Sequence, residues 1–412
     1  MVNPPAQPQG NGPLWRNRDF MLLRAGQTVS IVGSGVSGLA FPLLVLALAR
    51  STAQAGIVSF CGIVPGVLLA LPAGALVDRW NRKRVMALCD AGRALALGSI
   101  ALALAFGHLS VVLLTVVALS ESSLAVFFGL AESAAIPCVV SKDQLTEAVS
   151  INQATGEGAS LIGPSLSGVL YSLGQVLPFV VDSISYGISV LSLVFIKTEF
   201  QEERPPTARD LRSEVLEGLR WAWSQPFIRV SAFLIAGLNF LAGATTLTVI
   251  VLAKHLNASP ATIGLIFALF SAGGLIGSIT APWVRRWLRF SDVLVGVMWG
   301  FAVLWPLYAL APNALLLGLI GAAMGATGAT WNVIALSYLL GVIPDALQGR
   351  VRGAIQLFSR SGAPLGAIAS GTLLQVIGPV STVLVLSLVA LTLALTATLN
   401  GNVRNATPLT WT

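Results

Sequence analysis

Long apolar stretches constrain the fold of this chain more than any other feature of its sequence. Each holds about 20 residues or more, enough to cross a hydrocarbon core about 30 Å thick as a helix. Only 10% of the residues are charged, whereas soluble domains carry about 25%. Lipid must therefore cover most of the surface, and we predict an all-α polytopic membrane protein with about twelve spanning helices. The predicted helices are 20–48, 53–76, 85–106, 109–135, 146–172, 176–197, 227–253, 260–282, 292–312, 314–341, 350–376 and 378–400.

The Lys and Arg residues alternate between loops, and this pattern predicts the topology. Connections after even-numbered helices carry most of them, whereas those after odd-numbered helices carry only Arg50 and Lys254. Cytoplasmic loops are enriched in Lys and Arg, so we place the even loops and both termini in the cytoplasm, with the chain in the inner (plasma) membrane. The net charge of +7 then reflects topology, and we expect no nucleic-acid partner.

The longest loop separates two halves of six predicted helices each. We predict an N-terminal bundle at 1–197, a cytoplasmic central loop at 198–226 and a C-terminal bundle at 227–412. Apolar residues of the loop share one helical face, which predicts an amphipathic helix on the inner membrane surface, with a plain tether as the alternative. They are Leu211, Val215, Leu219 and Ala222.

The most specific motif lies between the second and third predicted helices. A glycine and an Asp-Arg pair precede a basic cluster, and the residues are Gly74, Asp78, Arg79, Arg82, Lys83 and Arg84. This segment resembles the signature loop of the major facilitator superfamily. The resemblance implies that superfamily's fold, with two six-helix pseudo-repeats. It also implies a conformational gate in which Asp78 meets a positive helix N-terminus and the cations anchor at headgroups.

A second motif in the fifth predicted helix is Gly163-Pro164-Ser-Leu-Ser-Gly168. It is similar to a motif of the superfamily's antiporters, with Ser167 in place of one glycine; a generic kinked helix is the alternative. The whole chain resembles the exporter branch that includes macrolide-efflux proteins and enterobactin exporters. That resemblance implies export of a hydrophobic or amphipathic small molecule, such as a drug, antibiotic or siderophore, by proton antiport.

Acidic residues inside predicted helices are candidates for proton coupling, because a charge in a spanning segment is costly. We propose Glu121, with Glu157 and Asp182 as further candidates. Glu121 lies mid-helix with no basic residue in its own helix, so desolvation should favour its neutral form. The alternatives are a solvated cavity carboxylate for Glu121 and structural roles for the other two. Many related exporters carry an Arg in the fourth helix, so their Arg-based mechanism does not transfer directly.

Two further charges, Asp90 and Arg93, are three residues apart in the third predicted helix, where we expect a structural pair. By analogy with the fold, helices 1, 4, 7 and 10 face the substrate cavity. Aromatic walls with few hydrogen-bonding groups suit a bulky, partly apolar substrate. The candidate cavity residues are Gln27, Ser34, Phe127, Phe128, Asn239, Thr246, Trp331, Asn332 and Tyr338.

Other functions are disfavoured by what the sequence lacks. The phosphate-binding pattern Gly-x-x-x-x-Gly-Lys-Ser/Thr is absent, so we expect neither ATP as the driver nor any cofactor. The two histidines, His108 and His255, lie in distant predicted loops, which disfavours a metal site and an enzyme. The expected partners are a small-molecule substrate, protons and the lipid bilayer, for a monomer. An importer or facilitator of the same fold, a channel and a membrane enzyme remain the alternatives.

Overall fold

The computed structural model describes residues 13–200, 220, 223–342, 353 and 356–404. The amphipathic helix predicted within 198–226 lies outside these residues. So do Arg350 and Arg352, which belong to one of the basic connections.

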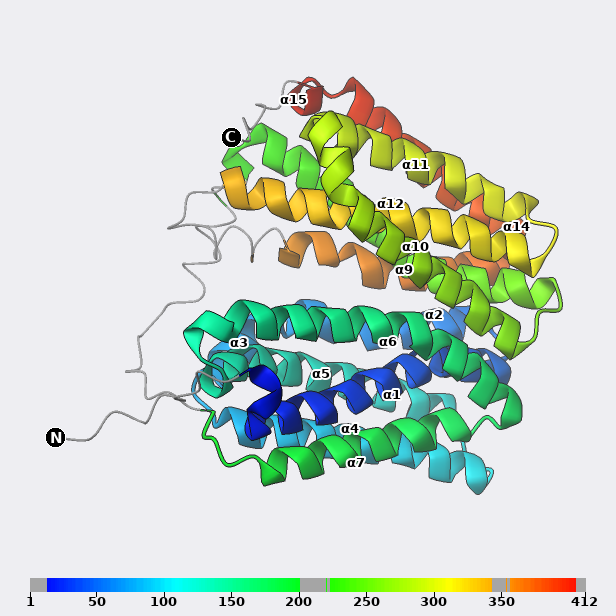
Figure 1. The fold of residues 1–412 in the computed structure, drawn as a ribbon. Helices are drawn as coiled ribbons and strands as arrows, with labels where there is room; N and C mark the ends of the chain where they lie inside the picture. The colour runs from blue at the N-terminus through cyan, green and yellow to red at the C-terminus, as the bar shows by residue number, and fades with distance from the viewer. Residues whose placement is uncertain (1–12, 201–219, 221–222, 343–352, 354–355, 405–412) are drawn as a thin grey trace. The chain divides into compact units, whose positions relative to one another are not determined.

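The described residues fold almost entirely into helices (Figure 1). Two short 3-10 turns, Leu14–Arg16 and Lys142–Gln144, accompany them. The α-helices are α1 (Arg18–Ala49), α2 (Thr52–Leu68), α3 (Ala70–Val77), α4 (Arg82–Ala105), α5 (Val111–Val139), α6 (Leu145–Leu173), α7 (Leu177–Phe195), α9 (Pro226–His255), α10 (Pro260–Trp287), α11 (Phe290–Leu310), α12 (Ala314–Val342), α14 (Gly362–Leu399) and α15 (Gly401–Arg404).

The predicted number of membrane crossings is confirmed. Nine helices in the described part of the chain are long and apolar enough to span a bilayer. One of these spans, Gln356–Leu399, contains Gly378 at a φ of 78°, and Pro379 follows, so the helix breaks there into two crossings. If that span counts as two crossings, the nine become ten. The helix α6 and the broken α2–α3 pair add two more, which gives the twelve predicted crossings.

Short polar residues fix where several helices begin. The Asn81 side chain accepts a hydrogen bond from the Arg84 N–H at 3.0 Å at the start of α4. The Ser110 hydroxyl accepts one from the Leu113 N–H at 3.1 Å at the start of α5. Each cap satisfies a backbone N–H that has no partner within its helix. The basic end of the loop before α4 is thereby fixed in place.

The chain packs as two units, which are described separately. The first comprises Met1–Leu44 and Leu68–Thr207, and the second comprises Val45–Val67 and Ala208–Thr412. The C-terminal end of α1 and all of α2 except Leu68 therefore pack with the second unit. There α2 meets α14, and a Cβ on Gly371 would lie 2.6 Å from the Gly56 Cα atom. The domain boundaries predicted from the sequence stay a prediction.

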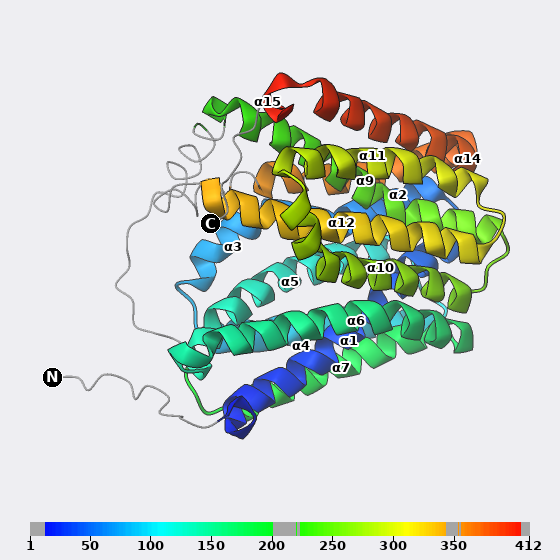
Figure 2. The same ribbon diagram turned by 45° about the horizontal axis from the view of Figure 1, so that its top comes forward.

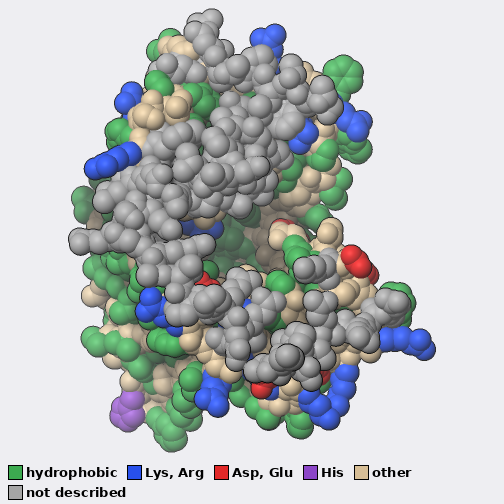
Figure 3. All heavy atoms as spheres, turned by 90° about the vertical axis from the view of Figure 1, so that its left-hand side faces the viewer, with side chains coloured by type: hydrophobic (Ala, Val, Ile, Leu, Met, Phe, Trp, Pro, Cys, Tyr) green, Lys and Arg blue, Asp and Glu red, His purple; other side chains and the backbone are tan. Residues whose placement is uncertain are grey.

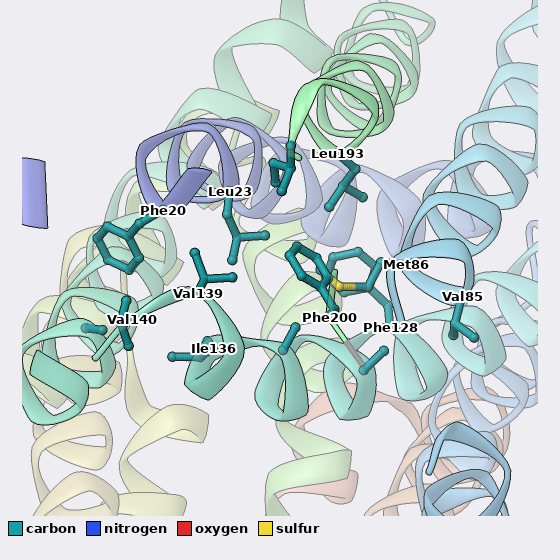
Figure 4. Packing of buried hydrophobic residues seen from close by; sticks show 14 of the residues in the cluster. Phe20, Leu23, Val85, Met86, Phe128, Ile136, Val139, Val140, Leu193 and Phe200 are labelled. Carbon is teal, nitrogen blue, oxygen red and sulfur yellow. The ribbon is translucent and has the colours of Figure 1, made fainter. Parts of the chain in front are cut away.

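In the first unit, α1, α4, α5, α6 and α7 run side by side in both ribbon views (Figures 1 and 2). A hydrophobic cluster joins all five of these helices at one end of the unit (Figure 4). Phe20 and Leu23 come from α1, Met86 from α4, Phe128 from α5 and Leu193 from α7, and all are buried. Burial of this apolar surface stabilises this end of the unit. Beyond the cluster, the same helices carry the polar side chains described below.

The second unit is held by close contacts between helix backbones. Gly273 and Gly277 of α10 lie directly against the backbone of Ala322 and Ala326 of α12. On the other side, Gly243 of α9 lies against the Ala363 carbonyl of α14. Small residues permit such contacts, which supply much of the packing energy between helices in lipid.

Candidate functional site

An ion pair between α4 and α5 forms the centre of a polar network inside the first unit. Arg93 donates hydrogen bonds from Nη2 and Nε to the Oε1 atom of Glu121, at 2.6 and 3.0 Å. The Arg93 side chain is 10% exposed and that of Glu121 is 30% exposed. The guanidinium is thus mostly removed from water, whereas the carboxylate keeps an accessible side.

Tyr186 of α7 completes this centre. Its ring lies under the Arg93 guanidinium, with 4.2 Å between the Cζ atom and the ring centroid. Its hydroxyl donates to Glu121 Oε1 at 3.3 Å and lies 2.8 Å from the Ser34 hydroxyl of α1. The π face of the ring attracts the Arg93 cation, and the Tyr186 hydroxyl and the Arg93 guanidinium both donate to the Glu121 carboxylate. Four helices therefore meet at one charged group.

Asp90, one turn before Arg93 on α4, occupies a more enclosed position. Its side chain is fully buried, and Ser189 of α7 donates to its Oδ2 atom at 2.5 Å. Gln27 of α1 donates in turn to the Ser189 hydroxyl at 3.3 Å. The other oxygen, Oδ1, has no hydrogen-bond partner among the described residues and lies 3.7 Å from Arg93 Nη1. The pairing expected from the spacing of Asp90 and Arg93 is therefore present but long.

Asp182 of α7 is also fully buried, and hydroxyl groups surround its carboxylate. Ser37 of α1 donates to Oδ2 at 2.5 Å, and Ser185 donates to Oδ1 at 3.0 Å. Gly33 of α1 permits the close approach, because a Cβ there would lie 2.5 Å from Asp182 Oδ1. Asp182 thus joins α1 to α7.

The environment of Glu121 differs from the one inferred from the sequence. We expected a carboxyl group governed by desolvation, with no basic residue in its own helix. The structure supplies a basic partner from the neighbouring helix α4, at 2.6 Å. Glu121 is therefore one member of an ion pair between two helices.

Sequence analysis missed a second buried ion pair, which joins three helices. Arg24 of α1 donates to Glu132 of α5 at 2.7 Å and to Asn152 of α6 at 2.6 Å. Both charges lie within predicted spans, which was a sufficient reason to include them among the candidates. Tyr186, Ser185 and Ser189 were also missed, although their spacing from Asp182 places them on one face of a helix.

The third coupling candidate stands apart from these groups. Glu157 of α6 is exposed and accepts a hydrogen bond from Gln153, one turn earlier on the same helix, at 2.9 Å. The structure therefore brings Glu121 together with Asp90 and Arg93, places Asp182 beside Tyr186 on α7, and leaves Glu157 outside the network.

The residues of the loop motif divide into anchored and exposed groups. Arg82 is buried and donates to the carbonyl oxygens of Ala134 and Phe200, at 3.0 and 3.2 Å, and Lys83 donates to the Ile196 carbonyl. Gly74 is half-buried in α3, whereas Asp78, Arg79 and Arg84 are exposed. The end of the molecule that carries this loop bears scattered Lys and Arg side chains (Figure 3). Two of the cations thus fasten α4 to its neighbours.

The antiporter-like motif provides close helix packing. A Cβ on Gly163 would lie 2.7 Å from the Gly35 Cα atom of α1, so the two backbones touch. Pro164 lies inside α6, and Gly168 is buried one turn later. In the second unit, Gly366 of α14 lies against the Phe240 carbonyl of α9 in the same manner. Gly163 and Gly366 thus have the same packing role in the two units.

The candidate cavity residues have varied surroundings. Gln27 and Ser34 belong to the polar network, and Phe127 stacks on Trp80 with ring centroids 6.1 Å apart. Phe128 and Trp331 are buried in hydrophobic clusters, and their place in the cavity wall stays a prediction. Asn239 donates to the Ile235 carbonyl of its own helix, Thr246 and Asn332 are exposed, and the Tyr338 side chain lies outside the described residues.

The network has the parts that proton movement needs. Glu121 has a partly accessible carboxylate paired with a buried guanidinium, and ionisable groups placed in this way inside spans are functional candidates. A second carboxylate lies within one side-chain movement of the same cation.

Comparison with known proteins identifies close similarity to transporters. Residues 11–409 match a family described as transmembrane secretion effectors. The multidrug efflux pump Tap of Mycolicibacterium fortuitum is 27% identical over 404 residues, which cover 94% of this chain and 95% of the relative. The enterobactin exporter EntS of Citrobacter koseri is 28% identical over 369 residues, covering 88% of this chain and 86% of the relative.

Solved structures share the fold at low sequence identity. The nucleoside transporter NupG superposes with a TM-score of 0.77 at 14% identity, covering 92% of this chain and 98% of its own. A bacterial homologue of the iron transporter ferroportin, in an inward-facing state, gives 0.68 at 16% identity, covering 93% and 100%. These similarities show the fold that the loop motif predicted.

Proposed function

The chain belongs to the transmembrane secretion effector family of the major facilitator superfamily, and we propose that it exports a hydrophobic or amphipathic small molecule by proton antiport. The observation that carries the export direction is the similarity, over nearly the whole chain, to an efflux pump and a siderophore exporter. The substrate class proposed is therefore drug-like or siderophore-like.

The buried polar network supports proton coupling. Glu121 combines a carboxylate with an accessible side and a cation partner inside a spanning region, an arrangement that is costly without a function. One proton moving down about 100 mV releases about 2.3 kcal/mol. At about 1.4 kcal/mol per tenfold ratio, this sustains roughly a fortyfold substrate gradient before any contribution from pH.

Everted membrane vesicles provide the test of direction and coupling. The probes are the amphipathic dye Hoechst 33342 and enterobactin, each offered outside vesicles whose interior is made acidic. An exporter that exchanges protons accumulates its probe inside these vesicles and loses it when nigericin collapses the pH difference. Saturable uptake that ignores the pH difference would indicate a facilitator, and flux without saturation would indicate a channel.

Glu121→Gln is expected to abolish accumulation against a gradient, because the amide takes up no proton at this position. Exchange of substrate between equal compartments should survive, since it requires no net proton movement. Glu157→Gln is the matched control, for it makes the same change at the exposed carboxylate of α6. Normal pH-driven transport by Glu121→Gln, with loss in Glu157→Gln, would move the proton site to Glu157.

We further propose that the loop around Asp78 acts as a gate during the cycle. Asp78→Asn keeps the size of the side chain and removes the charge that a helix N-terminus would attract. Transport should fall severely at unchanged membrane abundance, whereas Arg84→Gln, an equally conservative change at an exposed cation of the same loop, should have a small effect. Near-normal transport by Asp78→Asn would reduce the motif to an anchor.

The proposed setting follows from the basic loops. We place the protein in the plasma membrane as a monomer, with both termini on the cytoplasmic side.

A further inference from the structure

Arg93 lies between two carboxylates that differ in distance and in exposure. Glu121 Oε1 is 2.6 Å from Nη2, and Asp90 Oδ1 is 3.7 Å from Nη1. The first contact is a full hydrogen-bonded pair, whereas the second is only electrostatic. Arg93 is therefore hydrogen-bonded to Glu121, and a small side-chain rotation would bring it within hydrogen-bond distance of Asp90.

The Asp90 carboxylate is incompletely satisfied. Its side chain has no exposure, and the Ser189 hydroxyl occupies only Oδ2. A buried oxygen without a hydrogen bond costs about 1–3 kcal/mol, so such a group in a native fold requires an explanation. The nearest cationic group to Oδ1 is the Arg93 guanidinium itself.

The other charged and titratable groups around Arg93 do not offer the same position. Asp182 of α7 is already bound through both oxygens, by Ser37 and Ser185. Tyr186 of α7 presents its ring face to the guanidinium, and the facing residues of α1, Gln27 and Ser34, are neutral. Glu132 of α5 is paired with Arg24. The free acceptor beside Arg93 is therefore Asp90 Oδ1.

We propose that Arg93 changes partners during the proton cycle, from Glu121 when that carboxylate is charged to Asp90 when Glu121 carries the proton. A proton from the aqueous phase binds the Glu121 carboxylate, and the hydrogen bonds from Nη2 and Nε are released. The guanidinium moves across the Tyr186 ring and donates to Asp90 Oδ1. With the proton on Glu121, the net charge of the three groups changes from −1 to zero.

This assignment makes Asp90 a positioning residue and rests on the proposed proton coupling at Glu121. Without Asp90, protonation of Glu121 would leave a buried guanidinium with no carboxylate. That state is unfavourable, so the proton would bind only at higher proton concentration. When Asp90 is present, the released guanidinium pairs with its carboxylate, so no buried charge is left unpaired during the cycle.

A double-mutant cycle tests the exchange without any transport assay. Melting temperatures are measured on the purified protein in detergent for Asp90→Asn, Glu121→Gln and the double variant. Each single variant leaves Arg93 one carboxylate, whereas the double variant leaves none. The fall in melting temperature of the double variant should be about twice the sum of the falls in the two single variants. Additive losses would overturn the proposal. Glu157→Gln combined with Glu121→Gln is the matched control and should be additive, because Glu157 lies outside the network.

A double variant that does not fold still gives a result when the cation is also removed. Arg93→Met in that background eliminates the unpaired charge and keeps an apolar side chain of similar length. The triple variant should recover folded protein. If the triple variant is no more stable than the double variant, the two carboxylates do not act by compensating the charge of Arg93.

The pH profile of transport separates positioning from simple structural support. The rate of Hoechst 33342 uptake is plotted against pH, and its half-maximal point on the acid side is compared between variants. In Asp90→Asn this point should move to lower pH by about one unit or more. Ser189→Ala, which removes the hydroxyl on Asp90 Oδ2 without changing charge, should keep the wild-type position. An unmoved profile in Asp90→Asn would contradict the exchange. If wild-type uptake ignores pH, proton antiport fails and the exchange fails with it, whereas the melting cycle still shows whether Arg93 is shared by the two carboxylates.

Discussion

At the scale of single residues, the buried charges of the first unit depend on their partners. Arg24 and Glu132 have side-chain exposures of 6% and 13%, so neither charge is well hydrated. Removing one member of a buried pair leaves the other without compensation, at about 3–5 kcal/mol, whereas replacing both by apolar residues can be close to neutral. The effect of a substitution therefore depends on what remains beside it.

Glu132→Gln is expected to lower the melting temperature and the membrane abundance, because Arg24 loses its counterion inside the bundle. The pair of changes Arg24→Met and Glu132→Leu should restore most of the loss. Arg16→Met, at an exposed cation before α1, is the control for removing a positive charge. Thermal melting of the four proteins measures this. A loss in Glu132→Gln no larger than that in Arg16→Met would show that the pair contributes little.

At the scale of elements, glycines fix which helices touch. Gly163 brings α6 against α1, and Gly366 brings α14 against α9, so corresponding helices of the two halves meet through corresponding glycines. A methyl group at either position would meet backbone atoms, which cannot rotate away as a side chain can. Internal repeats of this kind are typical of transporters whose bundles move as units.

Gly163→Ala is expected to separate α6 from α1 and to destabilise the protein by about 1–3 kcal/mol, as in other overpacked interiors. Gly158→Ala on the same helix is the matched control, because a Cβ there meets nothing within 4 Å. The comparison is made by thermal melting in detergent and by uptake in vesicles. Equal behaviour of the two variants would show that α6 can move away from α1 without cost.

The sequence was sufficient to predict the helices but not their contacts. Runs of apolar residues placed α9 at 227–253 and α10 at 260–282, close to the observed Pro226–His255 and Pro260–Trp287. The partner of Glu121 could not be found in this way, because Arg93 lies on another helix, 28 residues away. Spacing rules relate residues on one helix, whereas contacts between helices depend on how each is rotated. The break at Leu69 between α2 and α3 falls inside the predicted helix 53–76, although Pro72 has no N–H to donate to the Leu68 carbonyl and so weakens the helix there.

At the scale of the whole molecule, the positions of the basic residues predict which side of the membrane each loop lies on. In the first unit, the connection between α3 and α4 and the connection between α6 and α7 lie at opposite ends of the helices (Figure 1). The former carries Arg79 and Arg82, and the latter carries no Lys or Arg. Cytoplasmic enrichment of positive charge therefore assigns the two ends to opposite sides.

Labelling of single cysteines checks this topology directly. Cys61, Cys89 and Cys138 are first replaced by Ala, and a cysteine is then introduced at Gln175 or at Arg79, both exposed. In intact cells, a membrane-impermeant maleimide should label position 175 and leave position 79 unlabelled, because only the α6–α7 connection faces outward. Permeabilised cells should show label at both positions, which proves that each thiol can react. Label at position 79 in intact cells would reverse the orientation, and with it the direction of the proposed export.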